Sequence, residues 1–215
     1  MRPVTRALGA TVVTIWRVTD SHVPGRRPGK AAILRSAVEV MGEDGFEGAS
    51  IRDMAARAQV SVAALYYHFP SKLGLLREFL NDAYDVTLDR LERRLNGVDG
   101  PPARLHSVVA TLVWTHAHDD FAKLASNVAL REYTRLEPPD LAGIEAKRQA
   151  LLDIVEGVLA QGIATGEFTT QEPRECARAI VTLVTSLVSV YPEIGRSLAE
   201  VTVLYQGFAA ALARG

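Results

Sequence analysis

Three serines, Ser50, Ser61 and Ser71, lie close together, and each stands directly before a run of helix-forming residues. A serine in this position accepts a hydrogen bond from a backbone amide of the first helical turn, so it marks where a helix begins. Asp53 follows Ser50 by three residues, as in a capping box. The predicted helices are Ile51–Ala58, Val62–His68 and Lys72 to about Asn96. Two short helices joined by so short a turn are typical of a helix-turn-helix.

Apolar residues recur at helical spacing through almost all of the remaining chain. A helix from Lys30 is predicted to stop in "GEDGF", where Gly42 and Gly45 supply the turn. Further helices are predicted near residues 103–118, 120–136, 139–164, 173–190 and 195–213. We find no β-type alternation of useful length and no internal repeat. The sequence therefore predicts an all-α protein of about nine or ten helices, with a small N-terminal domain and a larger C-terminal one.

Breaker-rich stretches indicate where the domains begin and end. Residues 1–25 show neither sustained helical periodicity nor capping, and "VPGRRPG" at 23–29 is typical of a linker or arm. We expect residues 1–25 to be a disordered extension or the product of a misplaced start codon, because several valines could serve as starts. Residues 26–72 are then the helix-turn-helix domain, and residues 73–215 are the helical domain that follows it.

Composition excludes several classes of protein. The formal net charge is −1, while seven basic and five acidic residues lie between Pro24 and Lys72, so any basic surface is local. The single Cys176 excludes an intramolecular disulfide. The longest uncharged run, residues 179–192, is shorter than the roughly 20 residues that cross a bilayer. We expect a soluble cytoplasmic protein without membrane contact.

No pattern of residues indicates catalysis, a cofactor or a metal. The chain has no glycine-rich phosphate loop and no G-x-S-x-G motif. His116 and His118 are two residues apart, so on a helix they point to different faces and cannot form a metal pair. We therefore expect no catalytic residues, no cofactor and no metal site.

The second short helix is predicted to have two different faces. One is apolar and should pack inward, with Leu65 and Phe69 against Ile51 and Met54. The other is directed outward and carries Val62, Ala63 and Tyr66. The helix of a helix-turn-helix that enters the major groove is divided in this way.

The aromatic cluster at the end of this helix suggests contact with DNA. Tyr66 offers a hydroxyl to a phosphate and a ring to a thymine methyl, and His68 can donate to another phosphate. Lys72, with the free amides of a helix N-terminus, supplies a third anion site. The alternative is that Tyr66, Tyr67 and His68 only cover a small hydrophobic core.

The stretch Ala49–Leu76, "ASIRDMAARAQVSVAALYYHFPSKLGLL", resembles the DNA-binding domain of the TetR family of transcriptional regulators. The combination of the Val-Ser turn, "LYYHF" and Ser-Lys carries this resemblance. It implies that bases are contacted by Arg52, Val62, Ala63 and Ala64. It implies that phosphates are contacted by Ser50, Tyr66, His68 and Lys72, and that Tyr67 makes a further DNA contact.

Three sites depart from the pattern of the family. Gln59 stands where the family usually has glycine, and Leu73-Gly74 stand where acidic residues are common. Ala63 and Ala64 replace glycine and a hydroxyl residue. Alanine contacts thymine methyls but forms no hydrogen bonds with bases, so we expect Arg52 and DNA shape to carry much of the specificity.

The resemblance also implies a homodimer formed by the last two long helices. The segments "AIVTLVTSLVSV" and "LAEVTVLYQGFAAALA" have the length and apolar surplus to form half of a four-helix bundle. The first segment can also be an internal core helix. Two-fold symmetry predicts an inverted-repeat operator on double-stranded DNA, with half-sites related by turns of about 34–36 Å.

A ligand pocket inside the C-terminal helices is implied as well. Its candidate residues are polar or aromatic side chains within apolar stretches: Trp114, His116, His118, Phe121, Asn127 and Tyr133, with Tyr191 as a further candidate. Taken singly, such residues are more often core or surface residues than ligand contacts. Four basic residues could attract an anionic effector such as an acyl-CoA thioester, or could form an exposed helix face: Arg131, Arg135, Lys147 and Arg148.

The sequence thus predicts a ligand-responsive, DNA-binding transcriptional regulator. We expect a repressor that binds its operator as a homodimer and is released by a small hydrophobic or acyl-CoA-like effector. Two alternatives come from other classes. One is a helical enzyme, which turnover of small molecules would reveal, and the other is a DNA-binding protein without an effector, whose DNA affinity no metabolite would change.

Overall fold

The computed structural model describes residues 29–138 and 140–215, and this part of the chain is helical with no strand. The expected extension at residues 1–25 lies outside the described residues. The described elements are α1 (Lys30–Gly48), α2 (Ile51–Arg57), α3 (Val62–His68), α4 (Lys72–Leu95), α5 (Pro101–Ala117), α6 (Asp120–Glu132), the 3-10 helix η2 (Tyr133–Arg135), α7 (Asp140–Ala164), α8 (Pro173–Ile194) and α9 (Leu198–Arg214). The all-α prediction is confirmed.

The three serines cap helices as predicted. The Oγ of Ser50 accepts from the amide of Asp53 at 3.1 Å, and that of Ser61 accepts from Ala64 at 3.1 Å. The Oγ of Ser71 accepts from the amide of Gly74 at 2.9 Å. Each cap satisfies a donor that has no partner within its own helix, so α2, α3 and α4 begin at defined residues.

The end of the first helix differs from the prediction. Gly42 does not form a turn but lies within α1, which continues to Gly48 with a kink at Gly45 (φ 73°, ψ 166°). A Cβ on Gly42 would lie 2.4 Å from Cγ of Leu124, so the glycine is needed where α6 approaches α1. Gly45 has the backbone conformation that favours glycine, and that part of the prediction is correct.

The helix predicted near residues 173–190 also ends later than expected, after the stretch "YPEIG" has begun. Helix α8 continues through this stretch to Ile194 and ends at Gly195, whose φ is 63°. A left-handed glycine is a common helix end, because it turns the chain without the steric cost that a Cβ brings.

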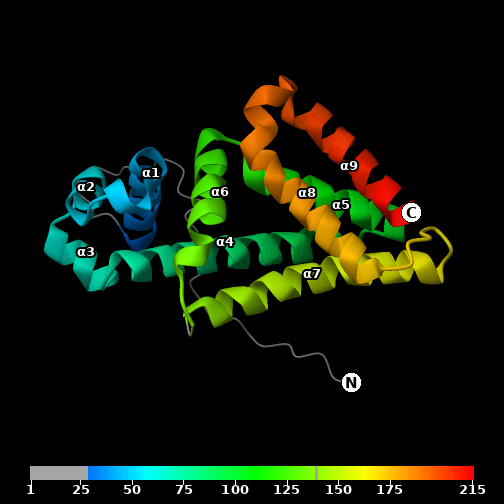
Figure 1. The fold of residues 1–215 in the computed structure, drawn as a ribbon, viewed down its shortest axis with the longest axis horizontal. Helices are drawn as coiled ribbons and strands as arrows, with labels where there is room; N and C mark the ends of the chain where they lie inside the picture. The colour runs from blue at the N-terminus through cyan, green and yellow to red at the C-terminus, as the bar shows by residue number, and fades with distance from the viewer. Residues whose placement is uncertain (1–28, 139) are drawn as a thin grey trace.

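Two hydrophobic clusters build the protein, and α4 contributes to both. The first cluster contains the inward residues predicted for the short helices, since Met54, Leu65 and Phe69 are all buried. Ile51 packs against the same cluster and is partly buried. The second cluster joins the C-terminal half of α4 to α5, α7, α8 and α9. In Figure 1, α4 runs from the small unit of α1–α3 into the larger one, where α7 lies below it in this view, and α6 stands between α1 and α8.

The turn between α2 and α3 places Gln59 in the left-handed region, with φ of 56°. Gln59 is the only residue other than glycine with a positive φ in the described part of the chain. Two hydrogen bonds fix this conformation, from Gln59 N to Ala56 O at 3.0 Å and from Val60 N to Ala55 O at 2.9 Å. The departure from the family's usual glycine therefore carries a steric cost.

We expect Gln59→Gly to raise the free energy of unfolding by about 1 kcal/mol, because glycine adopts this φ without strain. The greater freedom of glycine in the unfolded chain offsets part of the gain. Urea unfolding followed by circular dichroism measures the change. The control Gln59→Val should destabilise the protein, and a Gln59→Gly variant no more stable than the wild type would contradict the argument.

Candidate nucleic-acid interface and internal cavity

Helix α3 presents an apolar and aromatic surface. Tyr67 is 85% exposed, Tyr66 48% and Val62 38%, whereas Leu65 on the opposite face is fully buried. Ala63 is also exposed, and Ala64 is half-buried. The outward direction predicted for Val62, Ala63 and Tyr66 is confirmed. A protruding helix with small residues at its start and two phenols at its end can approach a groove closely.

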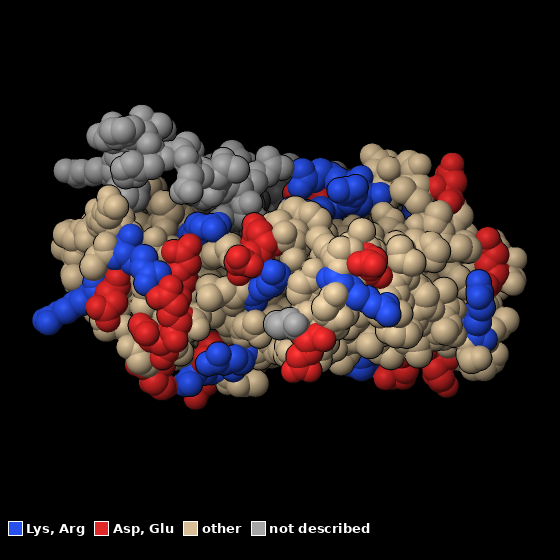
Figure 2. Space-filling model, turned by 90° about the horizontal axis from the view of Figure 1, so that it is seen from above, with Lys and Arg blue, Asp and Glu red and all other residues tan. Residues whose placement is uncertain are grey.

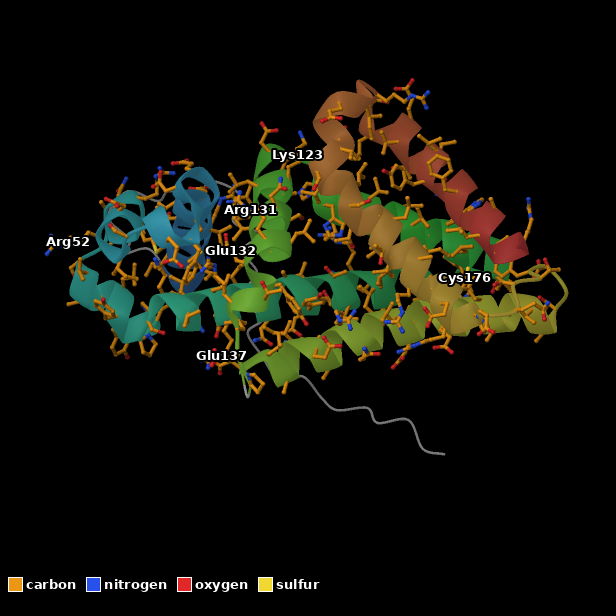
Figure 3. The ribbon with its side chains drawn as sticks, in the orientation of Figure 1. Arg52, Lys123, Arg131, Glu132, Glu137 and Cys176 are labelled. Atoms are coloured by element: carbon orange, nitrogen blue, oxygen red, sulfur yellow. The ribbon has the colours of Figure 1, made fainter. Side chains whose placement is uncertain are left out.

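Arg52 lies in the first turn of α2 and points away from the body of the protein (Figure 3). Its guanidinium forms no hydrogen bond or ion pair with any described residue. Arg57, on the same helix, is instead held by the carboxylate of Glu43 at 2.9 and 2.5 Å. Of these two arginines, only Arg52 has all its donors available for a base or a phosphate.

Ser50 and His68 lie on either side of this surface. The Oγ of Ser50 caps α2 and also donates to the carboxylate of Asp53. His68 is half-buried, and its ring packs edge-on against Tyr67 with the centroids 5.2 Å apart. Ser50, Arg52, Tyr66, Tyr67 and His68 thus all lie on α2 and α3 or directly before α2, and their contacts with DNA stay a prediction.

Lys72 has a different environment from the one that the sequence suggests. Its ammonium donates to the carbonyls of Phe46 at 2.6 Å, Ala49 at 3.1 Å and Glu47 at 3.4 Å. It also lies 4.5 Å from the centroid of the Phe46 ring. These carbonyls belong to the end of α1, so Lys72 joins the start of α4 to the end of α1.

Charge is not segregated over the face seen from above. Figure 2 shows acidic and basic side chains interspersed on this face, including the end formed by α1–α3. This distribution agrees with a net charge of −1. Any attraction to DNA therefore depends on a few placed groups rather than on a broad positive field.

An internal cavity of about 390 Å³ lies in the larger unit, walled by α4, α5, α6, α7 and α8. Most of its wall is apolar, including Phe79, Leu80, Leu112, Leu151 and Val181. Its polar members are Tyr84, Thr87, Thr115, His116, Ser126, Tyr133, Arg148, Arg178, Thr182, Thr185, Ser186 and Ser189. Arg178, Thr182, Ser186 and Ser189 are also exposed, so the cavity opens to solvent along α8. An apolar cavity with a few polar groups is the usual form of a small-molecule site.

Two of the predicted pocket residues, His116 and Tyr133, line this cavity. Trp114 and His118 lie on another face of α5, stacked on each other with centroids 3.5 Å apart, and Arg90 covers Trp114 at 3.6 Å. These two are four residues apart, so they share a face that His116 does not.

The remaining candidates lie elsewhere. Phe121 packs between α6 and α1, with the guanidinium of Arg35 3.7 Å from its centroid. Asn127 donates to the carbonyl of Lys123 at 3.2 Å, and Tyr191 packs against the second hydrophobic cluster. None of these three lines the cavity.

The sequence reasoning missed the hydroxyl-bearing face of α8. Thr182, Thr185, Ser186 and Ser189 recur at three- and four-residue spacing within an otherwise apolar helix. This periodicity was available in the sequence as a signal. It indicates a polar face on α8, and the structure shows that this face borders the cavity.

His116 is a neutral polar group in the cavity wall. Its Nδ1 lies 3.0 Å from Oγ of Ser126 on α6. Burial lowers the pKa of His116 from 6.5 to about 4, and burial is the only cause of this shift. The imidazole is therefore uncharged at neutral pH, with no charged group acting on it.

A charged corner lies at another part of the wall. The hydroxyl of Tyr133 donates to Glu145 at 2.7 Å, and Arg148 donates to the same carboxylate at 2.8 and 2.6 Å. Hydrogen bonds from Arg148, Gln149 and Tyr133 lower the pKa of Glu145 to about 2. Burial and the Glu145 carboxylate raise the pKa of Tyr133 to about 12.

This corner continues toward the end of α1 through η2. Arg135, two residues after Tyr133, donates to the buried Glu132 and, at 2.5 Å, to Glu47 of α1. Its guanidinium also lies 4.9 Å from the Phe46 ring that Lys72 contacts. Consecutive contacts therefore lead from the cavity wall to the residues that hold α1 and α4 together.

Other kinds of site have no support in the described residues. None of the helices in residues 29–138 and 140–215 is long and apolar enough to cross a membrane. The same residues contain no cluster of histidine, cysteine and carboxylate side chains suited to a metal ion. Cys176 is buried at the start of α8, and burial raises the pKa of its thiol.

Two family models match the chain. The model described as "Bacterial regulatory proteins, tetR family" matches residues 33–79. The model described as "Tetracyclin repressor-like, C-terminal domain" matches residues 98–211, more than half of the chain.

Known proteins agree with this match. The HTH-type transcriptional regulator UidR of Escherichia coli (strain K12) is 23% identical over 150 residues, which are 70% of this chain and 74% of UidR. The crystal structure of AibR in complex with isovaleryl coenzyme A and operator DNA has a TM-score of 0.75 at 22% identity, covering 86% of this chain and 98% of that one. FadR from Bacillus subtilis in complex with stearoyl-CoA has a TM-score of 0.73 at 19% identity, covering 85% and 98%.

We expect Lys72→Met to lower the free energy of unfolding by about 1–3 kcal/mol, because it removes three charge-assisted bonds to carbonyls at the end of α1. Thermal unfolding measures this loss, with Lys123→Met as the control, because the half-buried Lys123 of α6 pairs with Asp120 and donates to no backbone carbonyl. If Lys72 acted only as a phosphate contact, stability would not change, and the salt dependence of DNA binding would fall by about one unit of slope.

A second expectation concerns the stability of the folded protein at low pH. Between pH 6.5 and 4 an unfolded histidine takes up a proton that His116 in the folded protein does not, so stability falls as the pH is lowered. The full effect is about 3 kcal/mol and is absent above pH 6.5. Urea unfolding at pH 7 and pH 4.5 should show a smaller acid loss in His116→Leu than in the wild type. Equal losses in the two proteins would contradict the burial of a neutral imidazole.

Proposed function

Because this chain belongs to the TetR family of DNA-binding transcriptional regulators, we propose that it is a homodimeric repressor released from its operator by a small effector. Residues 26–72 are assigned to DNA binding and residues 73–215 to effector binding and dimerisation. We propose that it acts in the cytoplasm, where a bacterial operator lies. The observation that carries the effector proposal is the cavity, which is joined to the DNA-binding unit by the contacts of η2.

For DNA binding, we assign base contacts to Arg52, with Val62, Ala63 and Ala64 against thymine methyls. Phosphate contacts are assigned to Ser50, Tyr66 and His68, with Tyr67 as a further contact. The exposure of Tyr66 and Tyr67 and the unpaired donors of Arg52 support these roles. Lys72 is assigned chiefly to positioning α4 against α1, since its ammonium already has three carbonyl partners.

Dimerisation is proposed through α8 and α9. These helices expose large apolar side chains that no described residue of the monomer covers: Val190, Val203, Phe208 and Leu212. Covering them against the same helices of a second copy makes a four-helix interface with two-fold symmetry. The symmetric dimer would then bind an inverted-repeat operator.

For the effector, we propose an acyl-CoA-like molecule. The apolar wall suits an acyl group, while Arg148 and Arg178 place guanidinium groups near the exposed side of the cavity. Both arginines are paired with a glutamate three residues earlier, so they would exchange partners to hold phosphates. The complexes of AibR with isovaleryl coenzyme A and of FadR with stearoyl-CoA support this class of effector.

Release follows if the effector stabilises an arrangement of η2 and α6 that does not fit the operator. A hundredfold loss of operator affinity requires a preference of about 2.8 kcal/mol for that arrangement, which lies within the usual range of allosteric coupling. The route runs from Tyr133 through Arg135 to Glu47 and the end of α1.

The proposal is tested with an operator obtained by selection from random DNA and an electrophoretic shift at stated salt. Arg52→Ala should lower affinity for the selected site by about 1–3 kcal/mol and flatten the ranking of its base variants. Tyr66→Ala should weaken all variants alike, since a phosphate contact reads no sequence. The matched control is Arg57→Ala, which removes the same charge from α2 but should leave the ranking unchanged. An unchanged ranking in Arg52→Ala would contradict the assignment of base contacts to Arg52. Failure to select any site would contradict the proposed function as a DNA-binding regulator.

A further inference from the structure

The pair formed by His116 and Ser126 leaves one ring nitrogen facing the cavity. Ser126 is only 7% exposed, and its hydroxyl has no hydrogen-bond partner among the described residues other than Nδ1 of His116. A buried hydroxyl donates where an acceptor is in reach, so its proton lies toward Nδ1. The neutral ring then carries its own proton on Nε2, and no described residue accepts a hydrogen bond from that nitrogen.

Three threonine hydroxyls in the wall already donate to backbone carbonyls. Thr87 donates to Ala83 O at 2.8 Å, Thr115 to Thr111 O at 2.9 Å, and Thr185 to Val181 O at 2.8 Å. These groups can accept a hydrogen bond from a ligand but cannot donate one. Nε2 of His116, in contrast to these three hydroxyls, has a proton that no described residue accepts.

We propose that Nε2–H of His116 donates the hydrogen bond that recognises a carbonyl oxygen of the effector, and that Ser126, by donating to Nδ1, holds the ring in the tautomer that carries this proton. The proposal rests on the acyl-CoA-like effector proposed above, and it identifies which atom of that effector the cavity recognises. A thioester carbonyl is neutral and accepts one or two hydrogen bonds without bringing charge into the cavity.

The same arrangement selects against a free carboxylate. A carboxylate at this position would lie beside an uncharged ring rather than a cation, so the loss of its hydration would not be compensated there. A thioester is therefore favoured over the fatty acid that its hydrolysis releases.

Tyr84 supplies a matched control within the same cavity. Its hydroxyl also lines the wall, but it belongs to the charged corner, where Arg148 and Glu145 act on it. Tyr84→Phe removes a donor without touching the His116 pair. It should leave the recognition of a carbonyl unchanged.

The test compares octanoyl-CoA with S-octyl-CoA, a thioether that differs by the absence of the carbonyl oxygen. Isothermal titration calorimetry on the full-length protein gives the ratio of the two affinities. We expect the wild type to favour octanoyl-CoA about tenfold, the effect of one hydrogen bond at a donor that no described residue binds. In His116→Leu the ratio should fall to about one, whereas His116→Gln, which keeps an N–H donor, should retain most of it.

The outcomes separate the role of His116 from the proposed function. A ratio near ten in both the wild type and His116→Leu, or near one in the wild type, would overturn the role of His116 and leave an acyl-CoA effector standing. Loss of the ratio in Tyr84→Phe alone would assign the contact to the charged corner and overturn it as well. Wild-type protein that binds its selected operator but neither probe at millimolar concentration would overturn the effector class, and the His116 proposal with it.

Discussion

The ammonium of Lys72 fixes the geometry on which the other contacts depend. It binds three carbonyls where α1 ends and lies over the ring of Phe46, so α4 leaves the small unit in one direction. The guanidinium of Arg135 lies near the same ring and binds Glu47. Without the lysine, three carbonyls at the end of α1 and the ring of Phe46 would lose their common partner, and the start of α4 would lose a direct link to α1.

Close packing makes this corner able to transmit a displacement. Gly42 lets Leu124 of α6 approach the backbone of α1, and Phe121 packs beneath Arg35 one turn earlier on α6. Helices in such contact move together, because their interface has no free volume in which one can shift alone. Helix α6 also contributes Ser126 to the cavity and continues into η2. A ligand that moves α6 therefore moves α1 and the short helices that α1 covers.

Interactions between residues close in the sequence made the fold predictable, whereas parts of the site depend on contacts between residues far apart in the sequence. Serine caps act within three residues, so the starts of α2, α3 and α4 followed from the sequence alone. Gly42 was wrongly assigned to a turn because its role depends on Leu124, far along the chain. Helical spacing separates His116 from the face of Trp114 and His118, but it cannot tell which face borders an empty space. The carbonyl partners of Lys72 likewise come from another helix, and a sequence pattern contains no record of them.

The hydroxyl-bearing face of α8 has a consequence for how the two subunits respond. Ser186 and Ser189 border the cavity, and Val190, within one turn, is exposed on the helix assigned to the dimer. An effector bound in one subunit would thus contact α8 within one turn of the side chain that the partner subunit contacts. Under the proposed dimer, α8 forms both a wall of the effector site and the contact between subunits, so binding in one subunit is coupled to the site of the other.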